Sequence, residues 1–247
     1  MPEGHTIHRL AHDLGRLAGL PVAASSPQGR FADGAAAVNG QVLVRPEAHG
    51  KHLLLRFAFG EVVHVHLGMQ GKLLHVAGGP PKPQVRLRLD GGPGLVWDLV
   101  APSTCELLDD AAAAELVGRL GPDPLRGDAD PDEAFRRLTS SSSSLGAALL
   151  DQSVVSGVGN VFRAEALAAV GLHPSLPAAS LGRGDFDRLW STLVAMMRLG
   201  VETGVIEGDG RRVYKQERCA TCGGPVESFD LSGRTAYACP SCQRLAA

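Results

Sequence analysis

The chain has 247 residues, enough for one large domain or two of ordinary size. Its hydrophobic content of 44% is typical of a globular protein and excludes a disordered chain. The net charge of −2 excludes a strong overall attraction to nucleic acid, so any binding of that kind must depend on a few placed cations.

The first part of the sequence predicts one helix and then a region rich in β-strands. Four apolar residues recur at helical spacing: Ile7, Leu10, Leu14 and Leu17. Apolar residues then alternate with histidine or arginine in residues 63–67 and 85–89, as they do in half-buried antiparallel strands. Further strands are expected at residues 41–45, 52–59 and 95–98. The region from about residue 20 to residue 108 is therefore predicted to be β-rich.

The second part of the sequence predicts helices. They are expected at residues 111–120, 145–155, 161–170 and 185–203. Another begins at Asp130-Pro131, where aspartate is a favourable cap and proline a favourable first residue. Residues 121–129 are expected to form a connecting loop, and the serine run at residues 139–144 a flexible join. Strands first and helices later favour an α+β fold with two domains.

Two pairs of cysteines lie near the C-terminus. Cys219 and Cys222 are separated by two residues, as are Cys239 and Cys242, and sixteen residues lie between the pairs. This spacing is typical of a structural zinc site with four thiolate ligands. Two disulfides would suit a secreted protein, but the sequence shows neither a signal-peptide segment nor a run of 18 apolar residues. We therefore predict one structural zinc ion in a cytoplasmic protein with no membrane partner.

The fifth cysteine and three histidines carry weaker signals. Cys105 is isolated, so burial as a small apolar side chain is favoured over a role as nucleophile. His64 and His66 share one face of a predicted strand, and His75 follows nearby. Because no third ligand of clear type accompanies them, we predict no catalytic metal there.

The segment Gly157-Val158-Gly159-Asn160 is expected to join two helices. Glycine lets the backbone approach a partner closely, and free N–H groups at the start of the second helix can bind an anion. A dinucleotide-binding loop is excluded, because Phe162 stands where a third glycine is needed and no strand precedes the segment. Two interpretations stay open: an ordinary tight turn between helices, or a turn that grips a phosphate.

The first residues can carry chemistry. If Met1 is removed, Pro2 presents a secondary amine, and an α-amino group titrates near about pH 8, so part of it is nucleophilic at neutral pH. Attack of this amine on a sugar C1′ gives an iminium ion, which can accept electrons during elimination. Glu3 beside it can supply or remove protons. Alone, four terminal residues are more often an unstructured tail, and a single lysine such as Lys51 is more often a solvated surface residue.

Seven segments together resemble, in order, those of the formamidopyrimidine-DNA glycosylase/endonuclease VIII family of base-excision enzymes. They span nearly the whole chain: Pro2-Glu3-Gly4, Gly50-Lys51-His52, His66-Leu67-Gly68-Met69, Leu120-Gly121-Pro122-Asp123-Pro124-Leu125, Asp151-Gln152, Gly157-Val158-Gly159-Asn160 and Cys239-Pro240-Ser241-Cys242-Gln243. One such segment is a weak signal, whereas the ordered set is highly specific.

The resemblance implies an α+β fold in three parts. Residues 1–118 would form an N-terminal β-sandwich with a leading helix, residues 119–205 a helix–two-turn–helix DNA-binding domain, and residues 206–247 a zinc hairpin. It also implies a monomeric DNA glycosylase and abasic-site lyase that acts on damaged DNA by β- and δ-elimination.

The resemblance assigns roles by position. Pro2 resembles the family's Schiff-base nucleophile, and Glu3 resembles its acid. Lys51 resembles the cation that grips the lesion phosphate and assists β-elimination, and Arg234 resembles the hairpin arginine linked to δ-elimination. Met69 resembles the wedge that fills the gap left by an everted base. Phosphate contacts are implied for four further positions: His66, Arg119, Asn160 and the region of Tyr214.

Two departures from the family pattern favour the endonuclease VIII branch. Val100 and Ala101 stand in the loop where the formamidopyrimidine branch usually has an arginine and a phenylalanine, so the strand gap must be filled by Met69, either alone or together with Gln70. Only 58 residues lie between Asn160 and Cys219, which is short for the loop that covers oxidised purines. We therefore expect oxidised pyrimidines to be preferred.

A third departure leaves other classes of protein open. Thr6 stands where the family often has a supporting glutamate, which would also fit a catalytically silent DNA-binding protein of the same fold. A zinc-ribbon regulatory protein without DNA chemistry is the other alternative. It ranks last, because it leaves Pro2, Glu3 and Lys51 unexplained.

Overall fold

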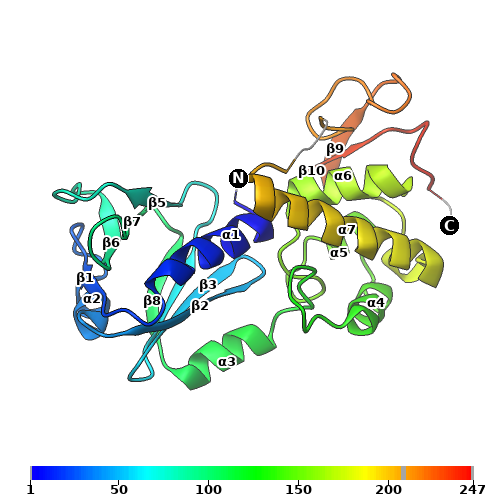
Figure 1. Cartoon of the computed structure of the whole chain (residues 1–247). Coiled ribbons are helices and arrows are strands. Elements are labelled where there is room, and N and C mark those ends of the chain that lie inside the picture. The colour runs from blue at the N-terminus through cyan, green and yellow to red at the C-terminus, as the bar shows by residue number, and fades with distance from the viewer. Residues whose placement is uncertain (1, 207–209, 246–247) are drawn as a thin grey trace. The chain divides into compact units, whose positions relative to one another are not determined.

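The computed structural model describes residues 2–206 and 210–245 (Figure 1). The chain divides into two compact units, Met1–Arg119 and Leu120–Ala247. The division into three parts, with boundaries after residues 118 and 205, stays a prediction. Within the described ranges, no helix is long and apolar enough to cross a membrane.

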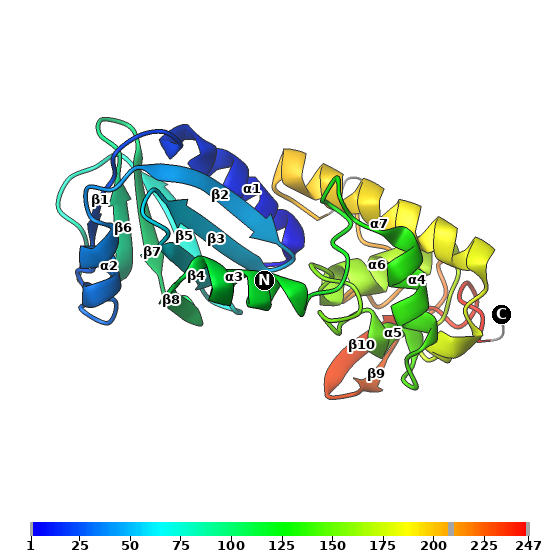
Figure 2. The same cartoon turned by 90° about the horizontal axis from the view of Figure 1, so that it is seen from below.

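Two four-stranded antiparallel sheets build the first unit (Figure 2). Their strand orders are β1-β6-β7-β5 and β2-β3-β4-β8. The strands are β1 (Ala23–Ser25), β2 (Leu43–His49), β3 (His52–Phe57), β4 (Val62–His66), β5 (Lys72–Val76), β6 (Val85–Asp90), β7 (Val96–Val100) and β8 (Thr104–Leu108). One apolar cluster contains Leu53 and Val65 from one sheet together with Leu89 and Trp97 from the other. The predicted N-terminal β-sandwich is therefore confirmed.

Four helical elements accompany these sheets: α1 (Gly4–Leu14), the 3-10 helix η1 (Gly15–Leu17), α2 (Ala32–Val38) and α3 (Asp110–Gly118). Helix α1 packs on β2 and β3 (Figure 2), and its predicted apolar residues Ile7 and Leu14 are buried in the sandwich core. Helix α3 lies on the outer face of the second sheet, where Ala113 packs against Leu54 and Val62. The leading helix predicted from the apolar spacing is thus in place.

Alternation along β3 and β4 decides which side chains stay outside the sandwich core. Successive residues of a strand point to opposite faces. Since Leu53 and Val65 enter the core, His52, His64 and His66 lie on the outer face. The second sheet therefore carries a row of histidines on its outer face.

Helices and one hairpin build the second unit. Its elements are α4 (Pro131–Thr139), α5 (Leu145–Ala148), α6 (Asn160–Val170), the 3-10 helix η2 (Ala178–Ser180), α7 (Arg183–Thr203), β9 (Glu227–Leu231) and β10 (Arg234–Ala238). As predicted, Asp130 caps α4, and its carboxylate accepts the N–H groups of Asp132 at 2.9 Å and Glu133 at 3.2 Å. Phe162 of α6 and Leu189 of α7 share one apolar core. The α+β fold class is confirmed.

The helix predicted over residues 145–155 is wrong in length, because α5 ends at Ala148. Gln152 gives the physical reason. Its side-chain amide donates to the carbonyl of Val158 at 3.1 Å and accepts the N–H of Gly157 at 2.9 Å. These bonds hold a loop in which the side chain satisfies backbone groups that a helix would otherwise pair.

Other differences concern short elements. The sequence pattern did not separate four of them from their surroundings: β1, α2, β5 and β8. The three strands among them are short and depend on pairing with a neighbour rather than on their own residues. The serine run at residues 139–144 ends in a cap, because the hydroxyl of Ser144 accepts the N–H of Ala147 at 3.4 Å.

Candidate active site

The start of α1 places a buried carboxyl group beside the chain's amino end. Glu3 precedes the helix with extended backbone angles, φ −125° and ψ −176°, and its carbonyl accepts the N–H of Thr6 at 2.9 Å. Glu3 is only 1% exposed, and Pro2 before it is half-buried. A proton donor or acceptor is therefore held one residue away from the predicted nucleophile.

His5 lies in the first turn of the same helix and is also buried. Its Nε2 atom is 3.3 Å from the hydroxyl oxygen of Thr6. Burial is the main cause that lowers the pKa of His5 to about 4, and the positive charges of the amino terminus and Arg9 lower it further. Thr6, which replaces the family's frequent glutamate, therefore contacts an imidazole that is neutral at neutral pH.

Lys51 lies in the two-residue turn between β2 and β3. Gly50 has a positive φ of 58°, and His49 pairs with His52 across the turn. A glycine with positive φ at the first central position is the type II′ pattern, whose twist matches that of the two strands. The hairpin therefore fixes the backbone of Lys51, whose side chain is half-buried.

His66 ends β4, and Met69 lies in the turn that follows. The Nδ1 atom of His66 accepts the N–H of Gly68 at 3.1 Å and lies 2.9 Å from Oγ of Ser103. Burial lowers the pKa of His66, and neighbouring charges that include Lys51 add to this effect. Met69 is 66% exposed, so a large apolar side chain stands in solvent, as a wedge between bases requires.

Three other residues singled out from the sequence have ordinary surroundings. Arg119 follows α3 and forms an exposed ion pair with Glu115 at 3.6 Å, a weak contact that a phosphate could replace. His75 belongs to the other sheet, where its Nε2 contacts the carbonyl of Gly94 at 2.8 Å. Cys105 packs against the sandwich core, and burial raises its pKa to about 12.

In the second unit, Asn160 is joined to the hairpin that carries Arg234. Asn160 is the first residue of α6, and its side-chain amide donates to the carbonyl of Thr235 at 3.0 Å. The buried Arg163 donates to the same carbonyl at 2.8 Å and to the side chain of Asn160. Arg234 precedes Thr235, follows a turn with positive φ at Ser232 and Gly233, and is exposed. The start of α6 and the hairpin tip are therefore built together.

Tyr214 is held by a carboxylate that the sequence analysis missed. Glu165 of α6 is buried and accepts three backbone N–H groups: Arg212 at 2.7 Å, Val213 at 3.1 Å and Tyr214 at 2.8 Å. The Tyr214 ring meets the ring of Tyr237 edge-on at 5.1 Å. The signal in the sequence was weak: Glu165 and Arg163 are the two charged residues of an otherwise largely apolar helix.

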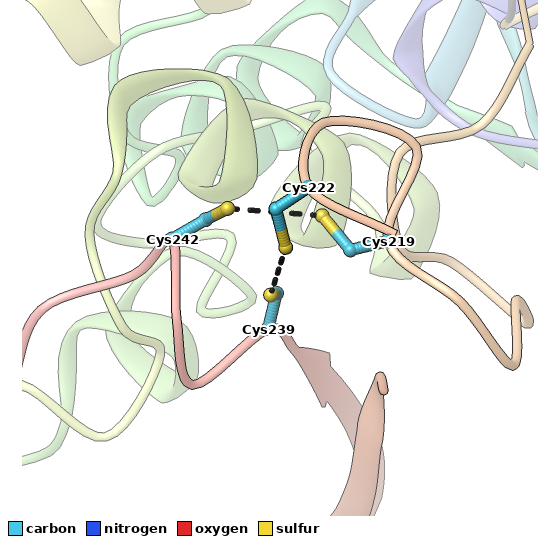
Figure 3. Close-up of side chains that lie close together, drawn as sticks. All are labelled: Cys219, Cys222, Cys239 and Cys242. Carbon is cyan, nitrogen blue, oxygen red and sulfur yellow. Dashed lines mark hydrogen bonds between the residues drawn. The ribbon is translucent and has the colours of Figure 1, made fainter. Parts of the chain in front are cut away.

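The four C-terminal cysteines converge at the base of the β9–β10 hairpin (Figure 3). Their sulfur atoms all lie within 4.8 Å of one another, and none forms a disulfide. The Sγ atoms of Cys222 and Cys239 are 3.5 Å apart, and those of Cys219 and Cys242 are 3.9 Å apart. Four thiolates at these separations fit one tetrahedral ion. Elsewhere in the described ranges, no group of three or more His, Cys, Asp and Glu side chains could share an ion.

The chain is similar to known proteins over nearly its whole length. Residues 1–99 match the formamidopyrimidine-DNA glycosylase N-terminal domain, and residues 120–209 match the formamidopyrimidine-DNA glycosylase H2TH domain. "Endonuclease 8 1" of Mycobacterium tuberculosis is 45% identical, covering 98% of this chain and 100% of that protein. The formamidopyrimidine-DNA glycosylase of Gloeobacter violaceus is 33% identical over 99% of this chain and 97% of that protein.

Solved structures agree with the sequence relatives. The formamidopyrimidine-DNA glycosylase of Thermus thermophilus has a TM-score of 0.81 at 28% identity, covering 98% of each chain. The Lactococcus lactis enzyme in complex with DNA containing an abasic site has a TM-score of 0.80 at 21% identity, covering 98% of this chain and 99% of that chain. The chain therefore belongs to the formamidopyrimidine-DNA glycosylase/endonuclease VIII family, on its endonuclease VIII-like side, and is a DNA glycosylase and abasic-site lyase.

Proposed function

We propose that this enzyme removes oxidised bases from damaged DNA, pyrimidines in preference to purines, and then cleaves the strand by β,δ-elimination. The observation that carries the proposal is the buried carboxyl group of Glu3 directly after Pro2, in a chain 45% identical to "Endonuclease 8 1" along its whole length. Those two residues supply a nucleophile and a proton donor at one place.

The chemistry begins once Met1 has been removed. The lone pair of the Pro2 nitrogen attacks C1′ of the damaged nucleotide, the bond between C1′ and the base breaks, and the base leaves with a proton. Glu3 supplies that proton or protonates the sugar ring oxygen as the ring opens. The resulting iminium ion stabilises the loss of a proton from C2′, and the 3′ phosphate leaves. A second elimination releases the 5′ phosphate.

Binding to DNA rests on a few placed side chains, as the net charge of −2 requires. Lys51 grips the phosphate at the lesion, and Arg234 assists the second elimination. Met69 fills the space left by the everted base. Further phosphate contacts come from His66, Arg119, Asn160 and the segment around Tyr214. The half-buried turn at Lys51 and the exposed Met69 support these assignments.

The metal at the four cysteines is zinc, and its role is structural. The four cysteine sulfurs would fill all four positions of a tetrahedral zinc ion, which would leave none for water or substrate. The ion holds the hairpin that presents Arg234. The enzyme acts as a monomer in the cytoplasm, on the nucleoid, and has no membrane partner.

Borohydride trapping tests this proposal. Wild-type protein, with loss of Met1 verified by intact mass, is mixed with duplexes that contain thymine glycol, dihydrouracil or 8-oxoguanine and reduced with borohydride. We expect a covalent protein–DNA adduct. As a matched control, the same protein with one extra uncleaved residue before Pro2 has no secondary amine and should give none. A wild-type protein that retains Met1 and forms no adduct with any lesion duplex would favour the alternative of a catalytically silent DNA-binding protein. Thr6 and Val100 are consistent with that alternative.

A further inference from the structure

Three polar residues on the outer face of the second sheet have no role in the reaction described above. They are His52 of β3, His64 of β4 and Glu106 of β8. In the strand register His64 pairs with Glu106, and His52 pairs with His66. These pairings bring side chains from three neighbouring strands to one place, directly beside the turn that carries Lys51.

Hydrogen bonds connect the three residues in a row. Nδ1 of His64 lies 2.8 Å from Oε1 of Glu106, and Nε2 of His64 lies 2.9 Å from Nδ1 of His52. The rings of His52 and His64 stack with centroids 5.1 Å apart and planes inclined by 24°. We call this row the Glu106–His64–His52 relay. His64 at its centre is only 3% exposed.

The chemistry of the relay fixes where its protons are. Beside an ionised carboxylate, which only accepts hydrogen bonds, the Nδ1 atom of a neutral His64 carries the hydrogen and its Nε2 atom accepts. Nδ1 of His52 must then donate to His64, which leaves Nε2 of His52 as an acceptor. Burial lowers the pKa of His52 to about 3, and nearby positive groups, Lys51 among them, add to this effect. His52 is therefore neutral at neutral pH, as the relay requires.

His66 next to the relay has the opposite arrangement. The backbone N–H of Gly68 can only donate, and it donates to Nδ1 of His66. A neutral His66 therefore carries its hydrogen on Nε2 and offers a donor, whereas His52 offers an acceptor. The rings of His52 and His66 lie 5.1 Å apart. A donor and an acceptor of fixed direction thus stand side by side at the end of the hairpin.

The other charged groups on this face pair among themselves. Arg56 donates to Glu47 at 2.6 Å and to Asp110 at the start of α3 at 2.6 Å. His49 lies 3.9 Å from Glu47. Two groups lower the pKa of both His52 and His66 by positive charge: His64 when it is protonated, which has the larger effect, and Lys51.

We propose that Glu106 is a positioning residue for Lys51: through His64 it fixes the tautomer of His52, whose Nε2 orients the Lys51 ammonium towards the lesion phosphate. An ammonium group has three equivalent donors on a flexible stem and no preferred direction of its own. A fixed acceptor at its side leaves the other donors for phosphate. The role rests on the proposed function of Lys51.

Nitrogen-15 imidazole NMR on the zinc-loaded, full-length enzyme tests the relay without any reaction. We expect His52 and His64 both to carry their hydrogen on Nδ1 and His66 to carry it on Nε2. Glu106→Gln keeps the size of the side chain, but an amide can donate as well as accept. This variant should therefore show mixed tautomers at His64 and His52, with His66 unchanged. Nε2–H tautomers of His52 and His64 in the wild type would overturn the proposal.

Strand cleavage at a preformed abasic site, measured in single turnover, tests the coupling to Lys51. Glu106→Gln should slow cleavage roughly tenfold, within the range found for residues that share one network. In the Lys51→Ala background the same change should have no further effect, because the group that it positions is gone. Glu202→Gln, at an exposed position of α7, is the matched control and should leave the rate unchanged.

The outcomes separate this proposal from the proposed function. Equal losses from Glu106→Gln with and without Lys51, or no loss from Lys51→Ala, would show that the relay does not act through Lys51. If the wild-type enzyme forms no borohydride adduct, the proposed function fails, and the tautomers alone then decide whether the relay exists. Thermal unfolding of each variant verifies that a lower cleavage rate does not result from loss of the folded structure.

Discussion

The two units hold their candidate site residues by different means. In the first, Lys51 stands at the end of two strands that contribute to an apolar cluster spanning both sheets. In the second, Arg234 stands on a two-stranded hairpin. The cluster beneath this hairpin is small, and its buried members are Val161, Ala164, Val213, Tyr214, Cys219 and Cys239. Two of these six are themselves ligands of the predicted metal site.

This difference indicates that the hairpin carrying Arg234 needs a source of stability other than apolar burial. A two-stranded hairpin is marginally stable in water by itself. Binding of the proposed structural zinc ion would supply roughly 10–16 kcal/mol in place of the burial that the hairpin lacks. The turn at Lys51 needs no ion, because its strands are already part of a sandwich. Loss of the metal should therefore damage one unit and spare the other.

The largest expected effect comes from removing a zinc ligand. Cys239→Ser should lower the metal content from about one zinc ion per chain to near none, because three thiolates hold the ion far less tightly. DNA binding should be lost with it, since Arg234 and the contacts of Asn160 depend on the hairpin. Metal analysis and binding to a lesion duplex are the measurements.

Cys105→Ala is the matched control, because this cysteine packs in the first unit and lies outside the metal group. It should keep the zinc and the binding. Hydrogen exchange should show the β-sandwich protected equally in both variants. If a chelator removes the ion and strand incision is unchanged, the second unit does not depend on the metal for its stability, and the proposed difference between the two units is wrong.

The next effect separates two functions within the first unit. Glu3→Gln should abolish base excision, because departure of the base needs the proton of the carboxyl group. Cleavage at a preformed abasic site should survive in part, since an open sugar needs mainly the amine. Both rates can be measured in single turnover on the same duplex. Equal loss of both activities would mean that Glu3 acts on the amine rather than on the base.

The sequence predicted local features better than long-range ones. The leading helix follows from the spacing of Ile7 and Leu14, and the cap of α4 from Asp130, because both patterns lie within a few residues. The four cysteines were found for the same reason. Each of these signals is complete within one helix, one turn or one hairpin.

The missed features depend on pairings across the chain. His64 meets Glu106 across 42 residues, and Glu165 meets Tyr214 across 49. The local sequence around each residue does not identify its partner, because strand register and helix packing decide which polar groups meet. The end of α5 at Ala148 is an exception, because it depends on local side-chain bonds of Gln152 to Gly157 and Val158, five and six residues further along the chain.

A smaller effect is expected at the turn between β2 and β3. Lys51→Ala should weaken excision and abasic-site cleavage together by about 1–3 kcal/mol, the loss of a charge-assisted contact to a phosphate. Lys72→Ala, at an exposed position of β5, removes the same charge from the same unit and should change little. If both variants lose activity equally, the effect comes from the overall positive charge of the unit and not from the position of Lys51 in the turn.

The smallest expected effect concerns which lesion the enzyme prefers. Two segments bear on this preference, one from each unit. At the end of β7, Val100 and the following Ala101 offer no cation or aromatic ring to probe the base opposite the lesion, so selectivity for that base should be weak. In the second unit, the short span between Asn160 and Cys219 leaves little chain to enclose a purine; it includes residues 207–209, which lie outside the described residues.

Reading an everted base needs walls and hydrogen bonds around it, and a missing partner changes discrimination by about 1–3 kcal/mol. We therefore expect thymine glycol and dihydrouracil to be excised roughly tenfold to a hundredfold faster than 8-oxoguanine. Single-turnover rates on duplexes that differ only at the lesion measure this preference. Faster removal of 8-oxoguanine opposite cytosine than of every oxidised pyrimidine would show that a purine is enclosed without the long loop. The expectation of a pyrimidine preference would then be wrong, while the place of the chain in the family would stand.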